Sequence, residues 1–304
     1  MVDFPIVDTH VHLWDPARIR YPWIEGIPQL NTPFLPEDFS RHCGSVEVEK
    51  IVFLQCDCVL EAHLQEARWI ASLAESDRRI SGIVPWAPLE EGEAARGSLD
   101  ALKEIALVRG VRRLIQSEDV TFCIRPEFVA GVKLLAEYDF SFDLCIYHRH
   151  LANTIRLVER CPEVRFILDH IGKPDIKNGL KAPWREELKL LSEFPNVTCK
   201  VSGLVTEADH NDWHREDLKP YIDHVATCFG FDRMVFGGDW PVATLACEYP
   251  LWVETLSWAL EGCSQEDLRK VFRQNGIEFY RRSEEHTSEL QSHSDLVCRL
   301  LLEK

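Results

Sequence analysis

The stretch Pro5-Ile-Val-Asp-Thr-His-Val-His-Leu-Trp-Asp15 decides the fold, because an apolar, strand-like run ends there in two histidines. Successive side chains of a β-strand point to opposite faces, so His10 and His12 leave the same face and can converge on one metal ion. Val11 points the other way, toward a packed layer. A His-x-His pair alone is weak evidence, so its meaning depends on the pattern that follows it.

Strand-like apolar runs alternate with helix-like segments along the rest of the chain. The predicted strands cover residues 6–10, 50–55, 80–86, 110–116, 140–147, 165–170, 197–202 and 234–238. Apolar residues three and four positions apart predict helices over residues 60–74, 94–105, 126–137, 153–160, 184–194, 217–228, 252–260 and 265–273. Residues 14–45, rich in Pro, Trp and Tyr, predict a long loop with one short helix at 36–42.

This alternation predicts a (β/α)8 TIM barrel, an α/β fold, in a single domain over residues 1–282. No glycine-rich dinucleotide fingerprint follows a predicted strand, which disfavours a doubly wound sheet. Residues 283–304 break the pattern with a Ser-, Glu- and His-rich run that resembles the translation of a sequencing adapter. We expect this segment to be a non-native, disordered tail, so its histidines are not candidate ligands.

Composition limits the partners. The net charge of -16 argues against nucleic acid and anionic membranes, which both require clustered Lys and Arg. No apolar run reaches the roughly 18 residues that a membrane span needs. The 11 cysteines form no zinc-knuckle pattern, which indicates reduced thiols and a cytoplasmic protein. A small-molecule substrate is therefore expected, and the oligomeric state is left open.

Polar residues of the ligand type lie at the ends of four predicted strands. His10 and His12 end the first strand, His148 follows the fifth, His170 ends the sixth, and Asp239 follows the eighth. The active site of a (β/α)8 barrel gathers at the carboxyl ends of its strands. Imidazole nitrogens and a carboxylate suit one divalent ion such as Zn2+, with an open position for water.

Five motifs lie at the predicted strand ends or in the loops that follow: Asp8-Thr-His-Val-His-Leu-Trp-Asp-Pro16, Tyr21-Pro-Trp23, Leu168-Asp-His-Ile-Gly-Lys-Pro174, Cys199-Lys-Val-Ser-Gly203 and Gly237-Gly-Asp-Trp-Pro241. Through these motifs the chain resembles the amidohydrolase superfamily, and more closely its sugar lactonases, the L-fuconolactonase- and L-rhamnonolactonase-like hydrolases. The resemblance covers residues 4–281.

The resemblance implies a metal site built on His10, His12 and Asp239. His148 would fill the place of a fifth-strand ligand, and His170 would be either the substitute ligand or a catalytic residue that polarises the substrate carbonyl. Two-metal relatives bridge their ions with a carboxylated lysine at the end of strand four, where this chain has Gln116 nearby. One metal ion or none is therefore expected rather than two.

The predicted reaction is hydrolysis of an aldonolactone, such as L-fucono- or L-rhamnonolactone, to the open acid. Asp239 would accept the proton of the attacking water and then protonate the leaving alkoxide. Without a metal, the histidines would donate hydrogen bonds to the developing oxyanion. A non-oxidative decarboxylase of an aromatic or dicarboxylic acid is the alternative. A catalytically inactive ligand-binding barrel is disfavoured, because the key polar groups are all present.

Substrate contacts are expected from residues beside these motifs. The candidates are Trp14, Trp23, Gln116, Lys200 and Trp240. The three tryptophans can stack on a sugar ring, although large aromatics in barrels also serve as packing. Gln116 can contact a hydroxyl or carbonyl, and Lys200 a lactone oxygen or substrate carboxylate, with a salt bridge as its other role. Lys173, on a loop after a glycine, is interpreted as a solvated charge.

Overall fold

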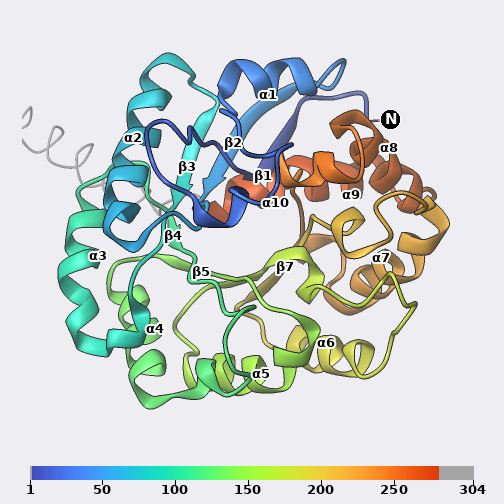
Figure 1. The fold of residues 1–304 in the computed structure, drawn as a ribbon. Coiled ribbons are helices and arrows are strands. Elements are labelled where there is room, and N and C mark those ends of the chain that lie inside the picture. Colours follow the sequence, from blue (N-terminus) through green and yellow to red (C-terminus); the bar gives the residue numbers. More distant parts are fainter. Residues whose placement is uncertain (1, 281–304) are drawn as a thin grey trace, which may run out of the picture.

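The computed structural model describes residues 2–280, over which eight strands alternate with helices in a ring (Figure 1). The strands are β1 (Ile6–Val11), β2 (Val48–Leu54), β3 (Ile80–Val84), β4 (Gly110–Val111), β5 (Ser141–Leu144), β6 (Phe166–Leu168), β7 (Val197–Val201) and β8 (Met234–Phe236). The helices are α1 (Pro36–His42), α2 (His63–Ser76), α3 (Arg96–Lys103), α4 (Pro126–Glu137), α5 (Leu151–Arg160), α6 (Trp184–Ser192), α7 (Arg215–Phe229), α8 (Tyr249–Ala259), α9 (Gln265–Arg269) and α10 (Asn275–Tyr280). The predicted tail at 283–304 lies outside the described residues.

All paired strands run parallel, in the order β1-β2-β3 in one sheet and β4-β5-β6-β7-β8 in a second. Isolated parallel bridges connect the two sheets at both seams, Ile83 with Val108 and Val11 with Trp240. At the second seam His10 accepts a backbone hydrogen bond from Asp239 at 2.8 Å. The predicted (β/α)8 barrel is confirmed.

The predicted strands are all present, but several end earlier than the apolar runs suggest. β4 ends at Val111 rather than at 116, and β5 ends at Leu144 rather than at 147. The predicted last helix at 265–273 is α9 followed by a π-helical turn over Lys270–Gln274, and α10 extends the helical segment beyond the prediction. Ser264 caps α9, because its side chain accepts a hydrogen bond from the Asp267 amide at 3.1 Å. No helix within residues 2–280 has the length and apolarity that crossing a bilayer requires.

One end of the barrel is filled by α10, which lies across the middle of the ring in Figure 1. Tyr280 packs there with inward-facing aliphatic side chains, among them Val52 of β2 and Val235 of β8. Its hydroxyl donates to Asp143 Oδ2 at 2.6 Å. The site is therefore confined to the opposite end, where the strands terminate in polar residues.

A buried carboxyl group lies on α2, beside the barrel wall. Glu66 is 1% exposed, and its Oε1 accepts a hydrogen bond from the Cys56 amide at 3.3 Å. Burial raises the pKa of Glu66 to about 8, although this amide and Tyr21 favour the charged form. The folded protein therefore holds Glu66 protonated at neutral pH, whereas the unfolded chain does not.

Glu66→Gln is expected to remove a pH dependence of stability. The folded pKa of Glu66 lies near 8 and the unfolded value near 4.5, so wild-type stability falls as pH rises between them. The free energy of unfolding of the amide variant should match that of wild type near pH 5 and exceed it by roughly 3–5 kcal/mol at pH 9. Urea unfolding at both pH values tests this, with exposed Glu61→Gln as control. A difference that does not change with pH would contradict it.

Candidate active site

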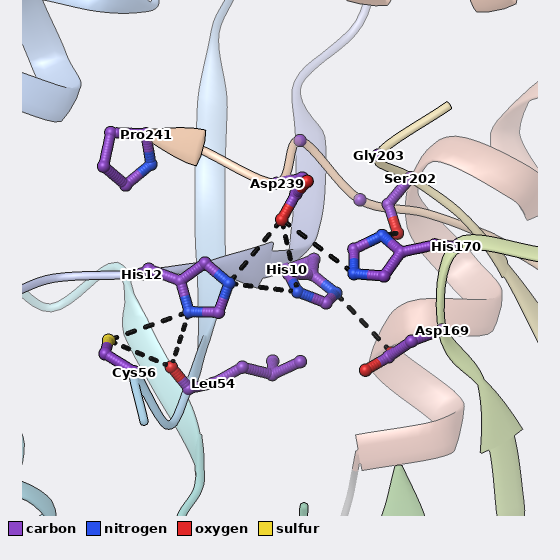
Figure 2. Close-up of polar contacts among 12 residues, drawn as sticks. His10, His12, Leu54, Cys56, Asp169, His170, Ser202, Gly203, Asp239 and Pro241 are labelled. Carbon is purple, nitrogen blue, oxygen red and sulfur yellow. Dashed lines mark hydrogen bonds and ion pairs between the residues drawn. The ribbon is translucent and has the colours of Figure 1, made fainter. Parts of the chain in front are cut away.

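Four of the predicted site residues meet at the carboxyl ends of the strands (Figure 2). Asp239 Oδ1 lies 3.5 Å from His10 Nε2, 3.6 Å from His12 Nε2 and 4.0 Å from His170 Nε2. The Nε2 atoms of His10 and His12 are 3.2 Å apart. All four side chains are at least nine-tenths buried. The structure thus brings one carboxylate oxygen and three imidazole nitrogens to a single point.

The opposite nitrogen of each ring faces a protein oxygen. The Nδ1 partners are Leu54 O for His12 at 2.9 Å, Ser202 Oγ for His170 at 3.0 Å and Asp169 Oδ1 for His10 at 3.5 Å. A carbonyl or carboxylate can only accept, so the partners of His12 and His10 favour the tautomer with the proton on Nδ1. Those two Nε2 atoms then offer lone pairs to the centre of the site.

This donor set fits a divalent metal. Ligands about 2.0–2.1 Å from a tetrahedral zinc ion lie about 3.3–3.4 Å from one another. The contacts among His10, His12 and Asp239 span 3.2–3.6 Å. His10, His170 and Asp239 also offer ligand atoms that all lie within 4.8 Å of one another. The hydrogen bonds of His12 Nδ1 and His170 Nδ1, and the Asp169 carboxylate 3.5 Å from His10 Nδ1, are of the kind that supports metal-ligating imidazoles.

Left-handed backbone conformations hold two of these side chains in place. His170 has φ 53° and Asp239 has φ 55°. Such a conformation costs a residue with a side chain about 1–2 kcal/mol and is concentrated at functional sites. Behind them, a Cβ on Gly203 would lie 2.3 Å from His170 Nδ1 and 2.9 Å from Asp239 Oδ2. Only glycine leaves room there for both side chains.

Asp8 ties the end of β1 to the end of β8. Its carboxylate accepts hydrogen bonds from the amides of His10 at 2.9 Å and Gly238 at 2.7 Å, and from the Tyr249 hydroxyl at 2.9 Å. A Cβ on Gly238 would approach Asp8 Oδ2 to 2.3 Å. Burial raises the pKa of Asp8 to about 7, against the effect of these donors. Asp8 therefore fixes His10 of β1 relative to the loop after β8 that carries Asp239.

Asp169 is the centre of a buried charge network below the histidines. Its Oδ2 accepts from Arg112 Nε at 2.8 Å, and its Oδ1 lies 2.8 Å from Lys200 Nζ. Lys200 also donates to Asp143 at 2.9 Å and is fully buried. Our prediction that Lys200 contacts the substrate is thus wrong. Its inward position on β7 makes it the counter-ion of two buried carboxylates.

Arg112 was missed by the sequence-based prediction. We placed Gln116 at the end of strand four, but β4 ends at Val111, so Arg112 is the first residue beyond the strand. Its guanidinium contacts Asp169 and, at 3.2 Å, Cys145 Sγ. Cys145, Asp169 and His170 form a second group with ligand atoms within 4.8 Å of one another. A fixed positive charge against two of its members disfavours a second metal ion there.

His148 lies apart from this cluster. It follows β5 by several residues, and its Nδ1 hydrogen-bonds the carbonyl oxygen of Lys173 at 3.0 Å. Among the described contacts, the imidazole of His148 hydrogen-bonds Lys173 and not His10, His12 or Asp239. Cys145 comes directly after β5 instead. The structure therefore brings His170, and not His148, together with His10 and His12.

Two of the three tryptophans are inaccessible. Trp14 and Trp240 are 0% exposed and pack with Phe34, whose ring centroid is 5.3 Å from Trp14 and 5.4 Å from Trp240. Our prediction that these two stack on a substrate is wrong, because they form the core under the first loop. Trp23 is half-buried and donates to Cys56 O at 2.7 Å. It remains a candidate substrate contact.

The polar wall beside His170 contains Gln116 and Lys173. Lys173 Nζ donates to Gln116 Oε1 at 2.7 Å and lies 3.7 Å from Glu207 Oε1. The Lys173 side chain is only 15% exposed. Our interpretation of Lys173 as a solvated charge is therefore wrong, whereas half-buried Gln116 stays a candidate contact.

Several supporting residues were present in the quoted motifs without being recognised. Asp8 lies within β1, two residues before His10, whereas Asp169 and Ser202 directly follow β6 and β7. The position directly after a strand was the available signal for Asp169 and Ser202. Arg112 had none, because its role depends on where β4 ends.

A family model for amidohydrolases matches residues 7–282. The L-fucono-1,5-lactonase of Burkholderia ambifaria is 29% identical over 282 residues, covering 90% of this chain and 95% of that protein. The L-fucono-1,5-lactonase of Burkholderia multivorans is 31% identical, with coverage of 80% and 84%. A crystal structure of a Burkholderia multivorans amidohydrolase with bound zinc matches with a TM-score of 0.80 at 28% identity, over 91% of this chain and 99% of that one. The chain, with its barrel and its histidine–aspartate cluster, belongs to the amidohydrolase family.

Proposed function

We propose that this amidohydrolase hydrolyses a sugar-acid lactone, such as L-fucono- or L-rhamnonolactone, to the open acid. The observation that carries the proposal is the single carboxylate oxygen of Asp239 facing three imidazole nitrogens in a buried site. The relatives named L-fucono-1,5-lactonase support the choice of a lactone. The acidic net charge supports a small molecule rather than a nucleic acid as substrate, and the free cysteines support a cytoplasmic location.

Asp239 carries the proton in this mechanism. Burial disfavours its charged form, but the neighbouring histidines outweigh this and hold its pKa below the usual range, so it is ionised at neutral pH. Its carboxylate accepts a proton from the water that attacks the lactone carbonyl. The same carboxyl group then donates that proton to the ring oxygen, which leaves as an alkoxide when the C–O bond breaks. Asp239 therefore takes up and releases one proton in each turnover and ends it ionised, as it began.

His170 orients the carbonyl or completes the ligand set. Burial lowers its pKa to about 3, although Asp239 opposes the shift, so the ring is neutral at neutral pH. The Ser202 hydroxyl can either donate to His170 Nδ1 or accept from it. In the first case Nε2–H donates a hydrogen bond to the carbonyl oxygen of the lactone. In the second Nε2 offers a lone pair, so Ser202 is compatible with both roles.

One divalent ion, with Zn2+ as our first choice, would be held by His10, His12, Asp239 and His170. Such an ion would lower the pKa of a bound water to about 7 and polarise a carbonyl. His10 and His12 keep their Nε2 atoms directed to this place through their Nδ1 contacts. This proposal replaces His148 by His170 as the third histidine of the predicted set.

The decarboxylase alternative receives less support. Its substrate carboxylate needs a cation within the site, yet Arg112 and Lys200 are both committed to Asp169. Lys173 faces Glu207. A neutral lactone suits these paired charges better than an aromatic or dicarboxylic acid does.

The test is a pH-indicator assay against five- and six-membered aldonolactones, including fucono-, rhamnono- and galactonolactones, since each turnover releases one acid. We expect kcat/KM above about 10⁴ per molar per second for at least one of them, a normal enzymatic value. Spontaneous hydrolysis without protein is subtracted. Protein that is inactive on every lactone but releases CO2 from aromatic carboxylates would favour the decarboxylase instead.

A further inference from the structure

A left-handed turn joins His170 to Lys173. The φ angles of His170, Ile171, Gly172 and Lys173 are 53°, 50°, 78° and 46°. The Lys173 amide donates to His170 O at 2.8 Å, which closes the turn. With about three residues per turn, positions i and i+3 lie on one side. Three of these residues carry side chains, for which the left-handed conformation is unfavourable. The turn nevertheless places Lys173 on the same side as His170.

The ammonium group of Lys173 lies in a cluster of polar groups. It donates to Gln116 Oε1 at 2.7 Å, lies 3.7 Å from Glu207 Oε1 and sits 5.3 Å from the ring centroid of Tyr147. Gln116 Oε1 is also 3.4 Å from Cys145 Sγ, which belongs to the group within 4.8 Å of His170. Gln116 and Cys145 therefore connect this largely buried cluster to His170.

The pKa of Lys173 agrees with a buried position among negatively charged groups. Burial disfavours the charged form of Lys173, but surrounding negative groups, Glu207 and Asp239 among them, hold its pKa above the ordinary value. Lys173 is therefore charged at neutral pH.

We propose that Lys173 and Glu207 together bind a ring hydroxyl of the substrate and so select among lactones. This inference rests on the proposed lactonase function. Lys173 has three N–H donors and uses one on Gln116. A hydroxyl oxygen can accept from a second, while the hydroxyl proton is donated to Glu207. The opposite charges of the pair cancel, which suits a neutral sugar ring.

His148 acts in this site as a positioning residue. Its Nδ1 lies 3.0 Å from Lys173 O, and its backbone amide donates to the same oxygen at 3.4 Å. These contacts hold the end of the left-handed turn. This gives His148 a function that does not require metal ligation.

The test compares Lys173→Met with Lys177→Met on the fastest lactone and on monodeoxy analogues that each lack one ring hydroxyl. Lys177 is the matched control, because it lies on the same loop, is 61% exposed and pairs with Asp209. In the wild type, loss of the recognised hydroxyl should lower kcat/KM about 10- to 100-fold. On the parent lactone, Lys173→Met should also lower kcat/KM about 10- to 100-fold, mainly by raising KM. On the analogue that lacks the recognised hydroxyl, the same substitution should lower kcat/KM less than about 3-fold. Lys177→Met should match wild type throughout.

If Lys173→Met lowers kcat/KM equally on every lactone, Lys173 has a structural role only and the proposal is overturned. An unchanged kcat/KM on the parent lactone would overturn it as well. A wild type that hydrolyses no lactone refutes the proposed function, and calorimetric titration with L-fuconate then tests the hydroxyl site separately. Binding weakened at least 10-fold by Lys173→Met and unchanged by Lys177→Met would support the site. Equal binding by all three proteins, or no binding by the wild type, would overturn it.

Discussion

Asp239→Asn is expected to lower kcat for lactone hydrolysis by about 100- to 10,000-fold, while KM stays within a few-fold of wild type. The amide keeps the shape of the side chain but cannot take a proton from water. Initial rates in the pH-indicator assay at saturating lactone measure this loss of kcat.

Metal content must be measured on the same Asp239→Asn preparation. Loss of activity with the ion retained would assign Asp239 to proton transfer. Loss of both would assign it to ligation first. Asp232→Asn, an 80% exposed carboxylate paired with Lys270, is the matched control and should retain wild-type kinetics. An Asp239→Asn enzyme as fast as wild type would remove this residue from the mechanism.

The parts of the site that the sequence predicted are those next to strong local signals. The β1 stretch ends in a histidine pair, and the glycines before Asp239 interrupt an apolar run, so both loops could be located. Helix α4 was predicted to the residue, because Pro126 marks its start and its apolar spacing is regular. Such signals lie within a few residues of the feature that they predict.

The errors arise where the outcome depends on the last residue of a strand. A strand that ends a few residues early changes which side chain faces the site. β5 was predicted to reach Tyr147, which put His148 at its end, but the strand stops at Leu144. In β4 the same error favoured Gln116 over Arg112. Apolar composition cannot define these ends, because the loops that follow are buried as well.

Lys200 shows a second limit. The sequence indicates that a lysine on a barrel strand is unusual, but its role depends on partners distant in the chain. Asp143 and Asp169 lie 57 and 31 residues away and reach it only after the barrel closes. A buried lysine between two carboxylates is a structural ion pair, whereas the same lysine with one face open would bind substrate.

His10→Ala is expected to abolish metal binding. Wild-type protein purified with zinc should contain about one equivalent of the ion, and His10→Ala less than about a tenth of that, because loss of one ligand from an open site weakens the chelate strongly. Activity should fall in parallel. Elemental analysis after gel filtration counts the ion.

His148→Ala separates the two possible ligand sets. Among the described contacts, its imidazole hydrogen-bonds Lys173 O and not His10, His12 or Asp239, so the variant should keep its ion. Loss of the ion from His148→Ala would restore His148 to the ligand set.

Asp169→Asn should lower metal affinity about 10- to 100-fold, since the Asp169 carboxylate orients His10 from behind.

The ion count also decides between mechanisms. Two ions per chain would contradict the argument from Arg112, whose guanidinium contacts Cys145 and Asp169 where a second ion would bind. No ion together with full activity would leave Asp239 to activate water alone. His10 and His12 would then have to donate hydrogen bonds from Nε2, which requires them to give up the Nδ1–H tautomer that Asp169 and Leu54 favour. That conflict is the physical reason to expect one ion.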